Sequence, residues 1–357
     1  MGSKPTGISG SRAATILGLN SFQSKYELWQ LLMEEQYPGF NSLQGYVMPE
    51  NPDNASIRWG TAFEDSVVKL AEDKAEMRII NREKFVTRHR FKRKSLNRVG
   101  SNGDVLVYGD FITCHIDGIY QEKSNIIRLH EGKTTSYWQY HDTWGEPGTD
   151  KVPAYVQCQV QHQLLCIGAE KCIVSVLVFP KRPDEWENEG REIVKLIKGD
   201  YEIQKHDPTL EPTYIKPTEW ASVLAQMGYF HQYPITANKD LHKEMVDVYK
   251  EWWQKHIIEK QEPTPEEVDD MKRCFPSPVG NIIASEEIER LCAEYKDIGK
   301  EISGTGRLGK MRKEVKVKIL DWMRKQDSVI DSDSREKTVL YDRAGKRLIS
   351  WNGKAFR

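Results

Sequence analysis

Long apolar runs are missing from this chain of 357 residues. It contains no stretch of about 18 apolar residues, the length that a helix needs to cross the hydrocarbon core of a membrane. The first residues also lack the pattern of a secretory signal. We therefore expect a protein that is neither embedded in a membrane nor exported, with the cytoplasm as its compartment.

Cysteine is scarce and scattered. The six cysteines form no C-x-x-C pair, the spacing that is typical of zinc and iron–sulfur sites. The nine histidines show no H-E-x-x-H spacing, which argues against a zinc hydrolase. We expect reduced thiols, and we interpret Cys158, which falls in a predicted helix, as a packing residue rather than a nucleophile.

Net charge is nearly absent as well, because 52 Lys and Arg residues face 53 Asp and Glu residues. The segment 78–98 departs from this balance, with nine basic residues and one acid, Glu83. Such a basic stripe is expected where phosphate groups are bound, and the alternative is a solvated basic surface. Arg88, Arg90 and Lys92 are the predicted contacts to a nucleic-acid backbone.

Helical and extended periodicities alternate through the first half of the chain. Ser24 and Glu27 predict a capping box for a helix over 25–35. Apolar residues at helical spacing predict a longer helix over 57–76, and strand patterns follow from about 79 to 134. A helix over 154–167 and an apolar strand come next. The interval 57–179 therefore reads as one α/β layer.

Prolines divide the second half into short helical pieces, which sets a predicted boundary between domains at 1–182 and 183–357. A helical hairpin is predicted over about 284–326 and a small β-hairpin over 338–351. The first hairpin helix has an apolar seam of Ile288, Leu291, Tyr295, Ile298 and Ile302. Three uses of this module remain open: packing of the seam within the hairpin, an interface for another protomer or partner, or a basic helix face that contacts DNA.

Two acids and a lysine interrupt the strands of 115–133, which read "HIDGIYQEKSNIIRLHEGK". If the turn pivots on Ser124, Asp117 lies opposite Glu131 with Cα atoms about 4.5–5.5 Å apart, and Lys133 points to the same side. Two neighbouring carboxylates are costly to bury without a cation between them. Mg²⁺, which prefers carboxylate oxygens, is the predicted cation. The alternative is an exposed patch of cross-strand ion pairs.

Polar side chains on the two flanking helices complete this candidate site. Glu64, in "WGTAFED", shares a helix side with Val68 and Ala71 and borders the apolar stripe. Gln159 and Gln161 lie on the helix after the sheet, where either amide could orient an attacking water molecule.

The motif formed by Asp117 and then Glu131-Gly132-Lys133 resembles the D…(D/E)-x-K signature of the PD-(D/E)XK nucleases. Five blocks then occur in order: "GISGSRAATILGLNSFQSKYELW", "WGTAFED", "IDGIY", "HEGKTT" and "YVQCQVQHQLLCIG". Together they resemble the YqaJ-type viral recombinases, which are similar to phage lambda exonuclease, over about residues 7–180. The resemblance implies an α/β fold, with a central mixed β-sheet flanked by helices and a mainly helical C-terminal extension.

Residue roles follow from this resemblance. It implies that Asp117, Glu131, the Gly132 carbonyl and Glu64 hold metal, that Lys133 stabilises or deprotonates the nucleophilic water, and that Gln159 lies near it. Ser9 and Ser11 match hydroxyls that bind a DNA 5′-phosphate. The family arginine is replaced by Thr6, so Arg12 or Lys4 is expected to substitute for it. Trp138, Tyr140 or Trp144 is a candidate surface for base stacking, with loop packing as the alternative.

The predicted function is a DNA exonuclease that uses Mg²⁺, for which Mn²⁺ can substitute. We expect 5′-to-3′ digestion of double-stranded ends by two-metal hydrolysis, leaving 3′ overhangs for recombination in a bacterial or phage-infected cell. A homo-oligomeric ring and a single-strand annealing protein are the expected partners. The alternatives are a non-catalytic protein that binds DNA ends or assembles on them, and a PD-(D/E)XK endonuclease.

Overall fold

The computed structural model describes residues 7–47, 54–81, 98–99, 105–107, 111–120, 128–195, 201–205, 213–275, 281–301, 307–326, 337–352 and 355–356. The chain divides into two compact units. Unit 1 comprises Met1–Leu19 and Asn51–Lys250, and unit 2 comprises Asn20–Glu50 and Glu251–Arg357. None of the described helices is long and apolar enough to span a bilayer. All six cysteines are free thiols, as expected.

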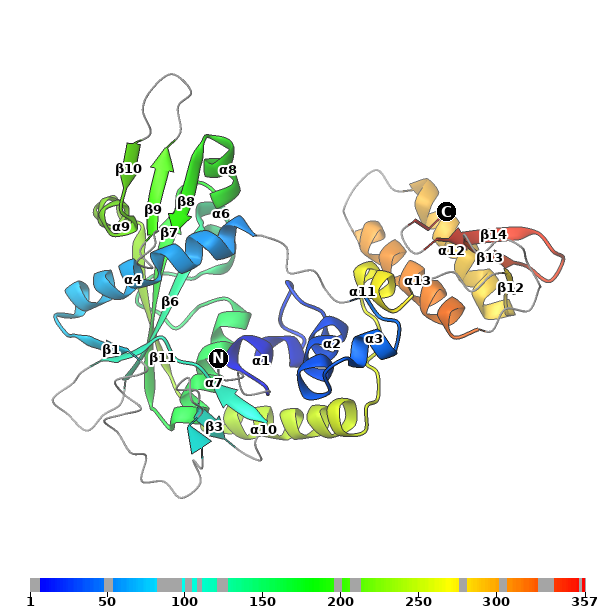
Figure 1. Ribbon diagram of the computed structural model, residues 1–357, viewed down its shortest axis with the longest axis horizontal. Helices are drawn as coiled ribbons and strands as arrows, with labels where there is room; N and C mark the ends of the chain where they lie inside the picture. The colour runs from blue at the N-terminus through cyan, green and yellow to red at the C-terminus, as the bar shows by residue number, and fades with distance from the viewer. Residues whose placement is uncertain are drawn as a thin grey trace. The chain divides into compact units, whose positions relative to one another are not determined.

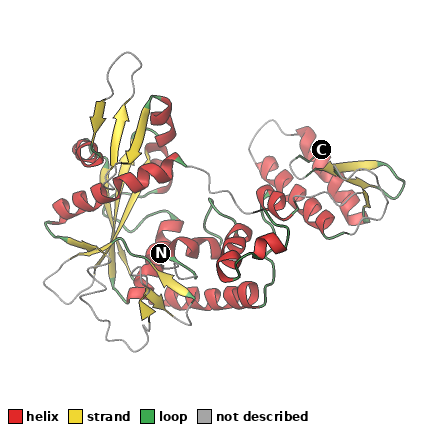
Figure 2. Cartoon of the chain, in the orientation of Figure 1, coloured by secondary structure: helices red, strands yellow, loops and turns green. Residues whose placement is uncertain are grey.

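A five-stranded mixed sheet forms the centre of unit 1 (Figure 1). Its strands, in spatial order, are β1 (Ile79–Asn81), β5 (Gly118–Tyr120), β6 (Arg128–Ser136), β7 (Lys171–Phe179) and β11 (Phe230–Thr236). The pair β6–β7 is parallel and the other pairs are antiparallel. Figure 2 shows the flanking helices. The predicted α/β class with a mixed sheet flanked by helices is confirmed.

The helix α4 (Ala55–Ala75) crosses one face of this sheet (Figure 1). The predicted apolar stripe is the buried one: Trp59, Phe63 and Val67 pack with Leu177 and Phe179 of β7. Trp186 of α8 (Pro183–Asn188) lies 4.7 Å from Trp59, measured between ring centroids. The helix α9 (Pro217–Gln226) adds Ala221 and Leu224 to the same core cluster.

The other face of the sheet carries α7 (Ala154–Ile167). A Cβ atom on Gly132 of β6 would lie 3.3 Å from Val67 of α4, whereas the neighbouring Glu131 bonds to α7. Because successive strand residues point to opposite faces, α4 and α7 lie on opposite sides of the sheet. The short helix α1 (Gly10–Ile16) packs against α7.

A second small sheet anchors the N-terminal segment. It contains β2 (Arg98–Val99), β3 (Val105–Val107) and β4 (Ile112–Cys114). The Ile8 N–H donates to the Phe111 carbonyl at 2.6 Å, and the Thr113 N–H donates to the Ile8 carbonyl at 2.9 Å. A Cβ on Gly7 would lie only 2.5 Å from the Phe111 carbonyl oxygen, so this approach requires glycine.

Unit 1 continues beyond 182, where the predicted nuclease core ends. The strand β11 completes the central sheet, and Tyr249 of α10 (Lys239–Trp253) packs against His162 of α7. The strands β8 (Arg191–Lys195), β9 (Tyr201–Lys205) and β10 (Thr213–Ile215) form a third, antiparallel sheet. The helix α6 (Tyr137–Thr143) follows β6 directly. The central sheet therefore depends on chain that follows the predicted boundary.

Unit 2 is mainly helical with one small sheet. Its elements are α2 (Lys25–Gln36), α3 (Phe40–Leu43), the π-helix η1 (Gln254–Ile258), α11 (Val268–Cys274), β12 (Asn281–Ile283), α12 (Glu286–Glu301), α13 (Arg307–Arg324), β13 (Thr338–Tyr341) and β14 (Arg347–Trp351). Both predicted hairpins correspond to elements here, α12–α13 and β13–β14. Ile288 and Ile298 share a buried cluster with Val315 and Ile319, so the seam packs within its own unit. Lys310, Lys313 and Lys318 of α13 remain exposed.

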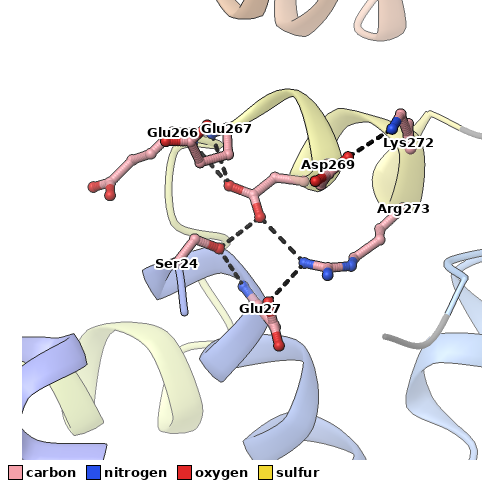
Figure 3. Close-up of polar contacts among 8 residues, drawn as sticks. Ser24, Glu27, Glu266, Glu267, Asp269, Lys272 and Arg273 are labelled. Atoms are coloured by element: carbon pink, nitrogen blue, oxygen red, sulfur yellow. Dashed lines mark hydrogen bonds and ion pairs between the residues drawn. The ribbon is translucent and has the colours of Figure 1, made fainter. Parts of the chain in front are cut away.

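A buried carboxylate joins α2 to α11 within unit 2 (Figure 3). Asp270 accepts hydrogen bonds from Ser24 Oγ at 2.5 Å and from the N–H groups of Glu266 and Glu267 at 3.1 and 3.0 Å. Arg273 donates to Asp270 and, at 3.0 Å, to Glu27. Ser24 also accepts from the Glu27 N–H at 3.0 Å, which confirms the Ser24 half of the predicted capping box. The Ser24–Asp270 and Glu27–Arg273 bonds each connect residues that are separated by 246 positions in sequence.

Candidate active site

A cleft of about 540 Å³ in unit 1 collects the five residues that were predicted to carry the chemistry. Glu64 reaches it from α4, Asp117 from the residue before β5, Glu131 and Lys133 from β6, and Gln159 from α7. The same cleft is lined by Ile57, Gly60, His115, Gly132 and Thr134. These side chains come from strands of the central sheet and from the two helices that flank it.

Strand register brings the two central acids together. Gly118 pairs with His130 and Ile119 pairs with Leu129, so opposite residue numbers sum to 248 as predicted. Asp117 directly precedes the first paired residue, Gly118, and therefore lies beside the Glu131-Gly132 segment of β6. Asp117 Oδ2 accepts a hydrogen bond from the Gly132 N–H at 2.9 Å. The turn at Ser124 lies outside the described residues.

Glu131 is 1% exposed and has donors on both carboxylate oxygens. Its Oε1 accepts from Lys133 Nζ and from Gln159 Nε2, each at 2.5 Å, and its Oε2 accepts from Gln163 Nε2 at 2.6 Å. Lys133 Nζ also donates to Gln159 Oε1 at 3.0 Å. The buried charge is therefore satisfied by one ammonium and two amides, as buried carboxylates require.

Gln163 is a member of this site that the sequence interpretation missed. Its Nε2 also donates to the His115 carbonyl at 3.0 Å. The amide that was weighed instead, Gln161, faces away: it donates to the Thr236 carbonyl at 2.8 Å and accepts from the Asn238 N–H at 2.9 Å. The spacing of four residues between Gln159 and Gln163, which puts both on one helix face, was the available signal.

The charges in the cleft shift the pKa values of Asp117 and Lys133. Burial, and next the charge of Glu131, raise the pKa of Asp117 to about 8. Burial disfavours the charged form of Lys133, but Glu131 and Asp117 outweigh this effect and raise the pKa of its ammonium group. Lys133 is therefore a fixed positive charge, while Asp117 binds a proton in the absence of another cation.

This donor set fits a hard divalent cation. Asp117 and Glu131 are adjacent acids whose mutual repulsion a cation would relieve, and Glu64 is close enough to raise the pKa of Asp117 further. Among the residues that the structure describes, no three His, Cys, Asp or Glu side chains are already gathered in a metal-binding geometry. Glu64 is exposed, and the Glu131 oxygens are engaged by amides, so side-chain rotation would accompany metal binding.

The residues predicted to bind a 5′-phosphate surround Gly10, which contacts Gln159 of this cleft. A Cβ on Gly10 would lie 3.1 Å from Gln159 Cγ, which places the start of α1 directly against the face of α7 that carries Gln159. Ser9 Oγ and Ser11 Oγ are 3.1 Å apart, and Arg12 Nη1 donates to the Gly7 carbonyl at 2.8 Å. Lys4 and Thr6 lie outside the described residues. The predicted backbone contacts, Arg88, Arg90 and Lys92, do so too.

Of the three aromatic residues considered for base stacking, two belong to the interior. Tyr140 and Trp144 are 9% and 8% exposed, and Tyr140 Oη lies 2.7 Å from Tyr233 Oη. For these two residues loop packing is the correct alternative. Trp138 of α6 is 69% exposed and remains available to a ligand.

Comparison with known proteins agrees with the sequence motifs. Residues 2–170 match the model of the YqaJ-like viral recombinase domain. An uncharacterized protein, YqaJ of Bacillus subtilis (strain 168), is 28% identical over 174 residues, which are 48% of this chain and 43% of the relative. The match thus spans less than half the length of that relative.

Two solved structures align with part of this chain. An alkaline exonuclease (LHK-Exo) from Laribacter hongkongensis aligns over 71% of this chain and 90% of its own, with 14% identity and a TM-score of 0.39. A phage-related exonuclease from Haemophilus somnus 129PT aligns over 72% of this chain and 98% of its own, with 12% identity and a TM-score of 0.37.

Proposed function

We propose that this protein, whose residues 2–170 match the model of the YqaJ-like viral recombinase domain, is a metal-dependent exonuclease that digests double-stranded DNA from its ends. The observation that supports this proposal best is the hydrogen-bonded set of Glu131, Lys133 and Gln159 beside Asp117. Titratable groups that lie in a cleft and have pKa values shifted by burial and by a specific charged neighbour are frequent at catalytic sites.

Asp117, Glu131, the Gly132 carbonyl and Glu64 would hold Mg²⁺, for which Mn²⁺ can substitute. Bound divalent ions in such sites lower the pKa of water and neutralise the phosphate that is attacked. The residues themselves set the geometry. The hydrogen bond from the Gly132 N–H to Asp117 Oδ2, at 2.9 Å, fixes the orientation of the acid.

Lys133 would stabilise charge rather than remove a proton. Its pKa is raised by the adjacent acids, so the ammonium form persists at neutral pH and attracts the negative charge that develops on the phosphate. Gln159 orients this ammonium through its Oε1 and Glu131 through its Nε2. Gln163 holds the second oxygen of Glu131, which leaves Glu131 one preferred rotamer.

The segment at the start of α1 would set the direction in which the DNA strand is digested. Ser9, Ser11 and Arg12 flank Gly10, which lies against Gln159, and would bind the 5′-phosphate of the strand that is digested, which gives 5′-to-3′ progress and a 3′ overhang. Trp138, exposed on α6 just after β6, would stack on a base. Arg88, Arg90 and Lys92 would contact the duplex backbone. A homo-oligomeric ring that surrounds the DNA, and delivery of the overhang to an annealing protein, complete the proposal.

Duplexes labelled at one 5′ end, with and without a 5′-phosphate, test this function. The wild-type protein should release label as mononucleotide in Mg²⁺ or Mn²⁺ and release none in EDTA. Glu131→Gln should lower the rate by at least about 10²–10³-fold, whereas the control Glu170→Gln, at an exposed position, should not. Binding of ends without any digestion would support the non-catalytic alternative, and internal cuts in a closed circle would support the endonuclease.

A further inference from the structure

The helix α13 of unit 2 carries a cluster of cations that the proposed function does not use. It comprises Arg312, Lys313 and Lys316 of α13 and Lys272 of the neighbouring α11, and we call it the α13 cation patch. Two of these cations are paired: Lys313 Nζ lies 3.8 Å from Glu267, and Lys272 Nζ donates to Asp269 at 2.6 Å. No carboxylate in the described part of the chain pairs with Arg312 or Lys316.

Arg312 is held against an aromatic ring instead of an acid. Its guanidinium carbon lies 4.3 Å from the centroid of the Tyr295 ring on α12. A Cβ on Gly299 would lie 2.7 Å from Arg312 Nη2, so glycine at this position makes room for the guanidinium. Arg312 Nε is enclosed by protein and makes no hydrogen bond with any residue that the structure describes. A charged group with a free donor is therefore fixed in place without a neutralising partner.

Lys316 repeats this arrangement one turn further along α13. Its Nζ lies 5.3 Å from the centroid of the Phe356 ring, which packs edge-to-face with the Tyr295 ring at 5.0 Å. Burial, and next the charges of Lys272 and Arg312, lower the pKa of Lys316, although Asp269 opposes the shift. Like charges are therefore crowded here at a cost to the fold, and a bound anion would relieve the repulsion.

The arrangement of the patch favours the phosphate backbone of a duplex as this anion. Arg312 and Lys316 are four residues apart and so are neighbours on the helix surface, where successive phosphates of one polymer can neutralise both. A guanidinium also binds phosphate oxygens through parallel N–H groups. Tyr295 and Phe356 are half-buried, and each is covered by a cation. They are poorly placed to stack on bases, as sites for single strands require.

We propose that the α13 cation patch binds the phosphate backbone of duplex DNA without sequence preference. This inference rests on the proposed function in taking DNA as the polymer, and it adds a contact in unit 2 that is separate from the catalytic cleft. Contacts to phosphates position a protein on a duplex and carry no sequence information. Because the apolar seam of α12 packs inside unit 2, the helical hairpin would use a different surface for DNA.

Fluorescence anisotropy of the full chain in EDTA tests the patch, because EDTA prevents metal-dependent digestion. The probe is a dumbbell duplex, both ends of which are closed by loops, so it offers no end to the catalytic cleft. Arg312→Met and Lys316→Met should each flatten the slope of log K against log salt by about 0.9 and weaken binding about three- to tenfold at about 50 mM salt. Lys316→Met should not lower the Tm, because its ammonium group is disfavoured in the folded protein. It therefore tests the patch even if Arg312→Met fails to fold.

Two control variants separate the patch from net charge. Lys325→Met removes a lysine of the same helix that pairs with Asp321 at 2.8 Å. It lies nine residues after Lys316 and so on the opposite side of α13, and its loss should leave the slope unchanged. Arg312→Lys keeps the charge and should keep most of the slope.

The inference is overturned if the dumbbell does not bind, if Arg312→Met and Lys316→Met keep the wild-type slope, or if Lys325→Met flattens it equally. Variants that lose affinity only for a single strand would overturn the assignment to duplex DNA. Displacement of the dumbbell by poly-L-glutamate at an equal concentration of charges would assign the patch to an acidic polypeptide instead. Digestion of labelled ends fails separately: a wild type that binds the dumbbell through the patch and digests nothing would support this inference and refute the exonuclease.

Discussion

Replacing Asp117 by asparagine should stabilise unit 1 while removing nuclease activity. In the folded protein, burial and Glu131 raise the pKa of Asp117 from 3.8 to about 8. The unfolded chain loses this proton near pH 4 and the folded chain keeps it until about pH 8. The contribution of Asp117 to stability is therefore greatest below its unfolded pKa, falls as pH rises between these values, and stays low above pH 8.

The size of this effect follows from the two pKa values. At about 1.36 kcal/mol for each pKa unit, the rise from 3.8 to about 8 sets an upper limit of about 6 kcal/mol at pH 9. Asp117 is half-buried, and solvent screening reduces this to about 2–4 kcal/mol. Asparagine keeps the acceptor for the Gly132 N–H and carries no charge, so it recovers this free energy.

Thermal unfolding in EDTA at pH 5 and pH 9 measures the difference. Asp117→Asn should raise the Tm of unit 1 by about 5–10 °C at pH 9 and by little at pH 5. Added Mg²⁺ should stabilise the wild type and leave the variant unchanged. Asp65→Asn, an exposed substitution on α4, is the control. A lower Tm for Asp117→Asn at pH 9, or an equal response to Mg²⁺, would refute this account of the site.

Three further predictions concern single residues. Gln163→Leu should lower nuclease activity about 10–100-fold by releasing one oxygen of Glu131, whereas Gln161→Leu should mainly lower the Tm; equal activities of the two variants would contradict the assignment. Lys133→Met should lower kcat about 10²–10³-fold with no gain of activity at high pH, and a gain would indicate a proton acceptor instead. Asp270→Ala should destabilise unit 2 by about 2–4 kcal/mol in urea. Asp269→Ala, in the same helix, should cost less than about 1 kcal/mol, because Asp269 pairs with the exposed Lys272.

The central acids could be placed from the sequence because their geometry is local. A hairpin register depends on the turn and on alternation within two neighbouring strands, and Gly118 and His130 pair as expected. The apolar stripe of α4 was equally predictable, since helical periodicity alone identifies Trp59, Phe63 and Val67. The position of Gln163 depends on the rotation of α7 relative to β6, which tertiary packing sets.

The assignment of chain segments to the two units could not be predicted in the same way. Trp29 of α2 donates its indole N–H to the His256 carbonyl, 227 positions further along the chain. Periodicity reports which face of α2 is apolar and carries no information about which distant segment covers it. The burial of Tyr140 and Trp144 has the same origin, because their partner Tyr233 lies on β11, beyond the predicted boundary.

Unit 2 is built from two segments that are far apart in the sequence, and this affects how the chain folds while it is being synthesised. The segment Asn20–Glu50 leaves the ribosome about 200 residues before the rest of unit 2. The apolar side of α2 therefore stays uncovered until η1 and α11 have been synthesised, after unit 1 is complete. Closing so long a loop late in folding is slow and leaves apolar surface open to aggregation. Nascent chains arrested before residue 250 should therefore recruit holdase chaperones through residues 25–36, and a shortened gene that ends there should express poorly unless codons 20–50 are removed as well.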